Sequence, residues 1–224
     1  MSKHLERDLE DLHRDILDLA TTVEEAICTA IRALQERDAD LARQVIAGDD
    51  AIDKQDNRIE EECLKMLALH QPVAVDLRRI TAVLKINTDL ERMADLAVDI
   101  AERALRLAEL PTIQVPEKLL RMTELTTGMV RQSLDAFIQL NAGEARRVCR
   151  LDDEVDRYNA EIIQELIGTM RSSKDMIEPA LSLFSATRHL ERIADHATNI
   201  AEDVIYQVEG EIVRHHPEAF QEHV

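Results

Sequence analysis

Apolar residues recur at spacings of three and four through stretches of more than 25 residues along most of this chain. This spacing places them on one face of a helix and is typical of long amphipathic helices. Breaks in the pattern divide the chain into six such stretches. The predicted helices cover about residues 5–36, 38–69, 72–107, 117–140, 144–171 and 174–208, with Asp38 as the cap of the second and Pro72 in the first turn of the third.

The length of the predicted helices sets the fold class. A helix of about 30 residues extends roughly 45 Å, so neighbouring helices must lie antiparallel rather than end to end. The clearest break is the segment 110–116, which contains two prolines. We therefore predict an all-α fold of two tandem three-helix bundles, residues 1–110 and 115–210, followed by a frayed tail over 211–224. Two separate domains and one continuous rod both remain compatible with this pattern.

An internal repeat relates the two halves. The segment LERMADLAVDIAE at 90–102 returns as LERIADHATNIAE at 190–202, with nine of the thirteen positions identical at an offset of 100. The segment DDAID at 49–53 returns as DDEVD at 152–156, at an offset of 103. A small change of offset is what a difference in loop length between two copies of a helical unit produces. The chain is therefore predicted to be a duplication.

Acidic residues four apart follow the same helices, and residues at this spacing share one helix face. Such like-charge pairs destabilise a helix by a few tenths of a kcal/mol each unless a cation compensates them. The pairs on the second and fifth helices are expected to face those on the third and sixth. The pairs are Asp49 with Asp53, Glu91 with Asp95, Asp152 with Asp156, and Glu191 with Asp195.

This arrangement predicts two carboxylate metal sites, one in each bundle. Oxygen-only ligation favours hard cations over zinc–thiolate chemistry, although iron, manganese, magnesium, calcium and zinc all remain candidates. Asp99 and Asn199, one turn further along, are predicted to extend the two sites. The alternative is that the acids are solvated surface groups, or that Arg92 and Arg192 neutralise them through salt bridges.

Other features exclude several classes of function. A ferritin-like di-iron centre needs Glu-x-x-His on two helices. Here Glu10 and His13 supply the motif outside the acidic stripes, and they are interpreted as an exposed polar patch. His196 is interpreted as a solvent-facing residue. The sequence has no glycine-rich phosphate loop and no nucleophile motif, so we expect a binding or regulatory protein rather than an enzyme.

Composition and charge restrict the possible partners and the cellular compartment of the protein. The formal net charge is −18, and no basic stripe with interleaved aromatics occurs, so nucleic-acid binding is not expected. No apolar run approaches the roughly 20 residues that span a bilayer, and the start of the chain lacks a secretory signal. Cys28, Cys63 and Cys149 are predicted to be buried free thiols. These features together predict a cytoplasmic protein.

The two Leu-Glu-Arg-x-Ala-Asp segments, together with residues 40–49 and 71–78, resemble the PhoU family over nearly the whole chain. This family carries two copies of a three-helix domain, and its metal-binding motif of two acids four residues apart maps onto the four pairs named above. Family members commonly have glycine where this chain has Ala94 and Ala194. The added methyl groups should stiffen the helices without touching the ligands.

The resemblance implies a cytoplasmic accessory protein of phosphate uptake that represses the phosphate-starvation (Pho) response. It also implies homodimers, and contacts with the transporter ATPase PstB and the sensor kinase PhoR, so that the chain meets the membrane only peripherally through its partners. The alternatives are a PhoU-like regulator of another transporter, a carboxylate-bridged metalloprotein and a plain helical scaffold. The sequence gives no dedicated anion nest, and direct phosphate binding is not predicted.

Overall fold

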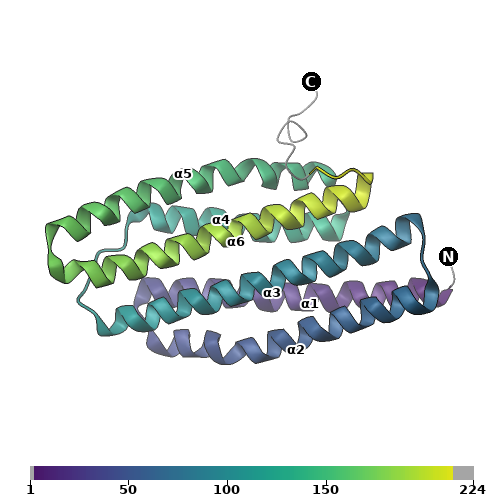
Figure 1. Cartoon of the computed structure of the whole chain (residues 1–224), viewed down its shortest axis with the longest axis horizontal. Coiled ribbons are helices and arrows are strands. Elements are labelled where there is room, and N and C mark those ends of the chain that lie inside the picture. Colours follow the sequence, from purple (N-terminus) through teal and green to yellow (C-terminus); the bar gives the residue numbers. More distant parts are fainter. Residues whose placement is uncertain (1–2, 214–224) are drawn as a thin grey trace, which may run out of the picture.

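The computed structural model describes residues 3–213, and its elements are helices joined by short turns (Figure 1). A short 3₁₀ helix over Lys174–Met176 precedes the last long helix. Within the described residues there are six α-helices and no strand. The helices are α1 (Lys3–Glu36), α2 (Ala39–His70), α3 (Ala74–Glu109), α4 (Glu117–Gln139), α5 (Ala142–Ser172) and α6 (Ile177–Glu209). The predicted all-α class is confirmed.

The starts of α2 and α5 show why the helices begin where they do. The Asp38 carboxylate accepts hydrogen bonds from the backbone N–H groups of Asp40 and Leu41, at 2.8 and 3.1 Å. Asn141 caps α5 in the same way. Such caps satisfy backbone donors that have no partner within the helix. Both residues are equivalent at the offset of 103, so the repeat extends to the capping chemistry.

The start of α3 differs from the prediction. Pro72 was predicted in the first helical turn, but α3 begins only at Ala74. Gln71 ends α2 in the left-handed region (φ 44°), and Val73 is extended at the N-cap of α3. Pro72 therefore lies in the turn between the two helices, where its missing N–H and fixed φ are equally well tolerated.

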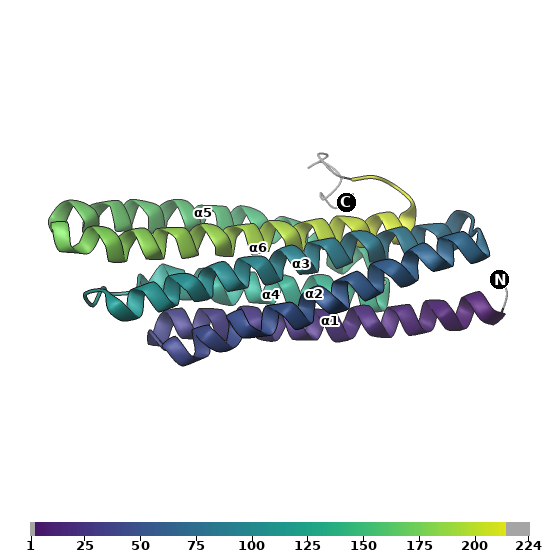
Figure 2. The same cartoon turned by 60° about the horizontal axis from the view of Figure 1, so that its bottom comes forward.

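The two three-helix bundles lie side by side rather than end to end (Figures 1 and 2). Helices α3 and α6 pack along one another and join the bundles, with a smaller contact between α1 and α4. Buried apolar residues of both bundles form one continuous core cluster. The continuous rod considered from the sequence is therefore not the arrangement observed.

An approximate two-fold relates the bundles. At the offset of 100, Asp89 and Asn199 of one polar contact are equivalent to His189 and Asp99 of another. The first pair is hydrogen bonded at 3.2 Å and the second approaches to 3.6 Å, both between α3 and α6. Exchanging the bundles thus maps one contact onto the other, and α3 and α6 run antiparallel.

The end of α6 positions the last described residues. Gly210 ends the helix with φ 80°, a left-handed conformation that favours glycine. In the segment that follows, Ile212 is 74% exposed and Val213 is 3% exposed, and the remainder of the predicted tail lies outside the described residues. No helix within residues 3–213 is both long enough and apolar enough to cross a membrane.

Candidate metal centres

The first acidic groove consists of Asp49 and Asp53 on α2 and Glu91 and Asp95 on α3. Burial, followed by repulsion from Asp53 and Asp95, raises the pKa of Asp49. Burial is also the main cause that raises the pKa of Glu91, with repulsion from Asp95 next and a smaller effect of Asp53. Repulsion therefore acts across the two helices as well as along each one. The sequence prediction that the stripes face each other holds in this bundle.

The second acidic groove consists of Asp152 and Asp156 on α5 and Glu191 and Asp195 on α6. Burial and repulsion from Asp195 and Asp156 raise the pKa of Asp152 to about 6. Burial and repulsion from Asp156 likewise raise the pKa of Asp195. The second repeat therefore reproduces the facing stripes, and its carboxylates are more strongly perturbed.

The donor set of both grooves fits a hard cation. Asp49 Oδ1 and Glu191 Oε2 are buried and have no hydrogen-bond partner, which is costly for a carboxylate oxygen unless a cation or donor compensates. Even so, no three His, Cys, Asp or Glu side chains of the described residues converge closely enough to hold a metal in this conformation. Binding would therefore require the carboxylates to rotate toward a shared ion.

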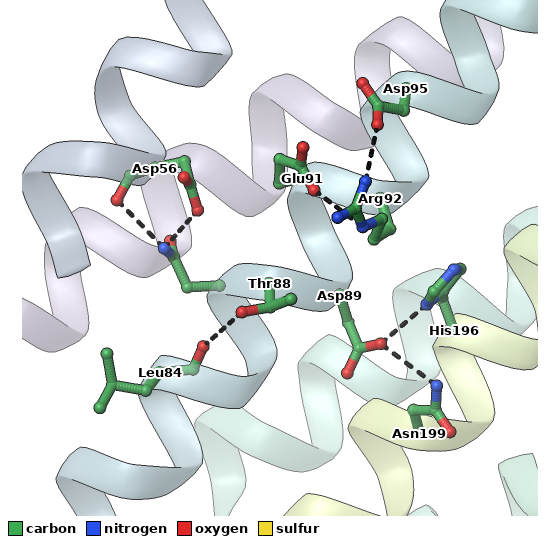
Figure 3. Close-up of polar contacts among 10 residues, drawn as sticks. Asp56, Leu84, Thr88, Asp89, Glu91, Arg92, Asp95, His196 and Asn199 are labelled. Atoms are coloured by element: carbon green, nitrogen blue, oxygen red, sulfur yellow. Dashed lines mark hydrogen bonds and ion pairs between the residues drawn. The ribbon is translucent and has the colours of Figure 1, made fainter.

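Arginines currently compensate part of the charge. Arg92 approaches Glu91 and Asp95 to 3.3 Å each in the first groove (Figure 3). In the second groove it is Arg188, at 2.9 Å from Glu191, that makes the recorded ion pair, rather than the predicted Arg192. The Arg92 side chain is 55% exposed, and ion pairs at this exposure contribute little stability. A metal ion can therefore displace Arg92 from these carboxylates at a small cost in free energy.

Asp99 and Asn199 do not extend the grooves as predicted. The Asn199 amide donates to Asp89 Oδ1, and Asp99 lies near His189, so both residues are at the contact between the bundles. The physical reason is the helical period, because each step of four residues also turns about 40° around the axis. Two such steps from Glu91 carry a side chain from the groove toward the neighbouring bundle.

His196 and Asp89 were missed by the sequence reasoning. The His196 side chain is 17% exposed rather than solvent-facing, and its Nδ1 lies 2.7 Å from Asp89 Oδ1, as Figure 3 shows. A signal was present in the repeat, because the equivalent of His196 is Leu96, an apolar position that is 2% exposed. Repeat alignment therefore indicates burial where the local pattern does not.

The two grooves differ one turn beyond the motif. The Asn87 side chain donates to the backbone carbonyl of Asp56 at 3.1 Å and to its carboxylate at 2.5 Å. Burial and repulsion from Glu60 raise the pKa of Asp56. Asp56 and Asn87 are equivalent to Asn159 and Thr187 in the second repeat, which carry no charge. The first groove therefore has a further carboxylate, which the sequence analysis did not select.

Two other expectations need correction. Cys28 is exposed on α1, although Cys63 and Cys149 are buried as predicted and burial raises the pKa of each of these two thiols to about 12. His13 does not belong to an exposed patch, because its ring is half-buried and packs on Phe137 with 5.0 Å between centroids. The His13 correction arises because α1 is covered on one side by α4, a contact that the periodicity of α1 alone does not reveal.

The raised pKa of Asp152 predicts a pH dependence of stability in the metal-free chain. The folded state holds this proton near pH 6 and the unfolded state only near pH 3.8, so stability increases as pH falls from 7.5 to 5. After discounting for solvent screening we expect a gain of at most about 1 kcal/mol from this residue between these two pH values.

Urea unfolding with a chelator, at pH 7.5 and pH 5.0, measures this gain as the difference between the unaltered chain and Asp152→Asn. The variant should be the more stable one at pH 7.5, and the difference should shrink at pH 5.0. An advantage of the variant that is equal at both pH values would contradict the prediction.

The fold and the grooves together define a class: a duplicated helical-bundle protein with facing carboxylate stripes in each half. Comparison with known proteins identifies the class, because the PhoU domain matches residues 16–104 and again 119–204. The chain belongs to the PhoU domain family. The two matched segments fall within the two bundles and coincide with the internal repeat.

Individual relatives cover nearly the whole chain. The sequence is 43% identical to a phosphate-specific transport system accessory protein PhoU homolog of Aquifex aeolicus, over 93% of this chain and 95% of that protein. It is 37% identical to the homolog of Deinococcus radiodurans, over 94% and 99% of the two chains. The crystal structure of PhoU from Pseudomonas aeruginosa superposes with a TM-score of 0.89 at 38% identity, covering 92% of this chain and 99% of that one.

Proposed function

We propose that this protein is an accessory protein of the phosphate-specific transport system, as its relatives are named, and that it represses the phosphate-starvation response. The observation that carries the proposal is the match of both bundles to the PhoU domain, together with relatives that align over almost their full length. The proposed mode of action is protein contact rather than catalysis. The partners implied by the family resemblance are the ATPase PstB and the sensor kinase PhoR.

The two acidic grooves are proposed as metal sites that serve this regulation. The carboxylates of each groove, listed above, would hold a hard divalent or trivalent cation, which would offset their mutual repulsion and tie two helices together. Buried carboxylate oxygens without partners and raised pKa values support this assignment. Because each groove joins two adjacent helices, metal occupancy would stiffen the outer faces of the bundles, which are available for docking. A cytoplasmic homodimer is part of the same proposal.

Deleting the gene tests the proposed repression of the phosphate-starvation response. In phosphate-rich medium the deletion strain should produce several-fold more alkaline phosphatase than its parent, because repression is lost. Complementation with the intact gene should restore low output. Output that stays as low as in the parent would reject repression of the phosphate response and favour a PhoU-like regulator of another transporter.

A further inference from the structure

A cleft opens between the two bundles at the end where α1 begins. It has a volume of about 350 Å³ and lies between α1, α3, α4 and α6. Its apolar wall includes Leu9, Val83, Phe137 and Leu140. The size and the mainly apolar lining are those of a binding site rather than of a packing defect.

The equivalent place at the other end of the molecule is closed. There Leu34 and Gln35 are the counterparts of Phe137 and Ile138, and the cavity that they border holds only about 10 Å³ and lies nearer the middle of the helices, beside Ile100 and Leu190. Arg37, the counterpart of Leu140, donates hydrogen bonds to backbone carbonyls at the end of α3 and in the linker that follows. The cleft is therefore a feature of one end, although the repeat makes both ends alike in principle.

One wall of the cleft contains a buried polar residue, Gln207, whose side-chain oxygen has no partner. Gln207 is 9% exposed, and its side-chain oxygen is buried with no hydrogen-bond partner. Its counterpart at the closed end is Leu107, an apolar residue that is 1% exposed. A polar group in place of leucine is costly in a closed core, and the cost is removed when a donor from another molecule enters.

The charges on the rim favour a cationic occupant. Glu6 and Glu10 stand on the α1 wall, and the described side chains form no ion pair with either of them. Arg79 is the single arginine or lysine of the lining and likewise forms no ion pair among residues 3–213. The chain as a whole carries a formal charge of −18, which steers basic partners toward it.

The apolar surface continues beyond the cleft. Ile138 and Leu140 are 45% and 43% exposed at its edge, and Val75, one turn before Arg79 on α3, is 47% exposed. The α1 wall from Glu6 to His13 is about 10 Å long, which matches two turns of a helix. A surface of this length, with apolar residues at its edge, suits a docked helix better than a small molecule.

We infer that this cleft binds an amphipathic helix of a partner protein, with apolar residues at i, i+3 or i+4 and i+7 and basic residues on its flanks. The apolar residues would enter between α1 and α4, and the Gln207 side chain would turn toward a donor on the helix. The start of α1 in a second copy is itself acidic, so self-association through this cleft is disfavoured. The inference goes beyond the proposed function, because it requires neither a metal nor a transporter.

Fluorescence anisotropy with the full chain at 150 mM salt tests the inference. The probe is a labelled 15-residue peptide of leucines at the stated spacing and lysines elsewhere, compared with a peptide of the same composition whose leucines are spread around the helix. Ile138→Glu with Leu140→Glu is the cleft variant. The matched control is Ile177→Glu with Leu181→Glu, which replaces equally exposed residues (40% and 49%) at the opposite end and adds the same charge.

The cleft variant should bind the amphipathic peptide at least tenfold more weakly, although its added acids increase the electrostatic attraction. The control variant should bind as well as the unaltered chain or slightly better. Equal binding of both peptides, or equal loss in both variants, would overturn the inference. Sedimentation that shows a dimer of the unaltered chain, lost only in the cleft variant, would assign the cleft to a second copy and overturn it too.

Discussion

Replacing Asp152 and Asp195 by asparagine is expected to abolish metal binding at the second acidic groove and to stabilise the metal-free chain. Burial is the main cause that raises the pKa of both carboxyl groups, and repulsion across α5 and α6 from Asp195 on Asp152, and from Asp156 on Asp195, adds to it. Asparagine preserves the shape but removes both charges. A residue that only orients a metal ligand typically contributes about 10- to 100-fold to metal affinity, and a residue that binds the metal directly contributes more.

Titration with Mn²⁺, monitored by calorimetry, measures the loss of metal binding. Thermal unfolding in the presence of a chelator measures the stabilisation of the metal-free chain. The number of bound ions should fall by half, because the first groove is intact. The melting temperature without metal should rise by roughly 2–4 °C, which corresponds to about 1 kcal/mol for a chain of this size. Asp153→Asn with Glu154→Gln is the matched control, since both side chains are exposed on α5 outside the groove. Unchanged Mn²⁺ stoichiometry in the groove variant would reject the metal assignment.

Leu190→Ala is expected to cost about 3–5 kcal/mol of unfolding free energy, a large part of the total for a domain. Leu190 is 2% exposed and borders a cavity shared with Leu34 of α1, Ile100 of α3 and Leu119 of α4. Its truncation therefore enlarges a void at the junction of both bundles, where no single helix can move to fill it.

Urea unfolding of Leu190→Ala, followed by circular dichroism, measures this cost. Leu181→Ala serves as the control on the same helix, because that side chain is 49% exposed and its loss should cost less than about 0.5 kcal/mol. A cost below about 1 kcal/mol for Leu190→Ala would mean that the bundles are not held together by this contact.

Sequence periodicity was sufficient for the helices and for their pairing within each bundle. Asp38 and Asn141 mark the starts of α2 and α5 by their own chemistry, and the repeat at 90–102 and 190–202 assigns the same role to α3 and α6. The facing acidic stripes follow from the spacing of four residues on adjacent antiparallel helices. Each of these features follows from a pattern within one helix or from the comparison of the two repeats.

The contact between the bundles could not be predicted in the same way. Asp89, His196 and Asn199 meet only because α3 packs on α6, a choice among several possible faces of two similar bundles. Local patterns do not specify which face of a bundle is covered, so His196 and Asn199 were both placed wrongly. The cleft at Gln207 was missed for the same reason, since it is lined by four helices from both repeats.

The approximate two-fold between the bundles has the geometry of a symmetric dimer whose two subunits are joined in one chain. A dimer of identical subunits must present two identical ends, because one gene encodes both. A single chain with two copies is free of this restriction, and each copy can change alone. Replacements such as Arg37 against Leu140, and Leu107 against Gln207, are of this kind. Duplication within one chain has therefore allowed the two ends of a nearly symmetric molecule to differ, with a cleft at one end and a filled contact at the other.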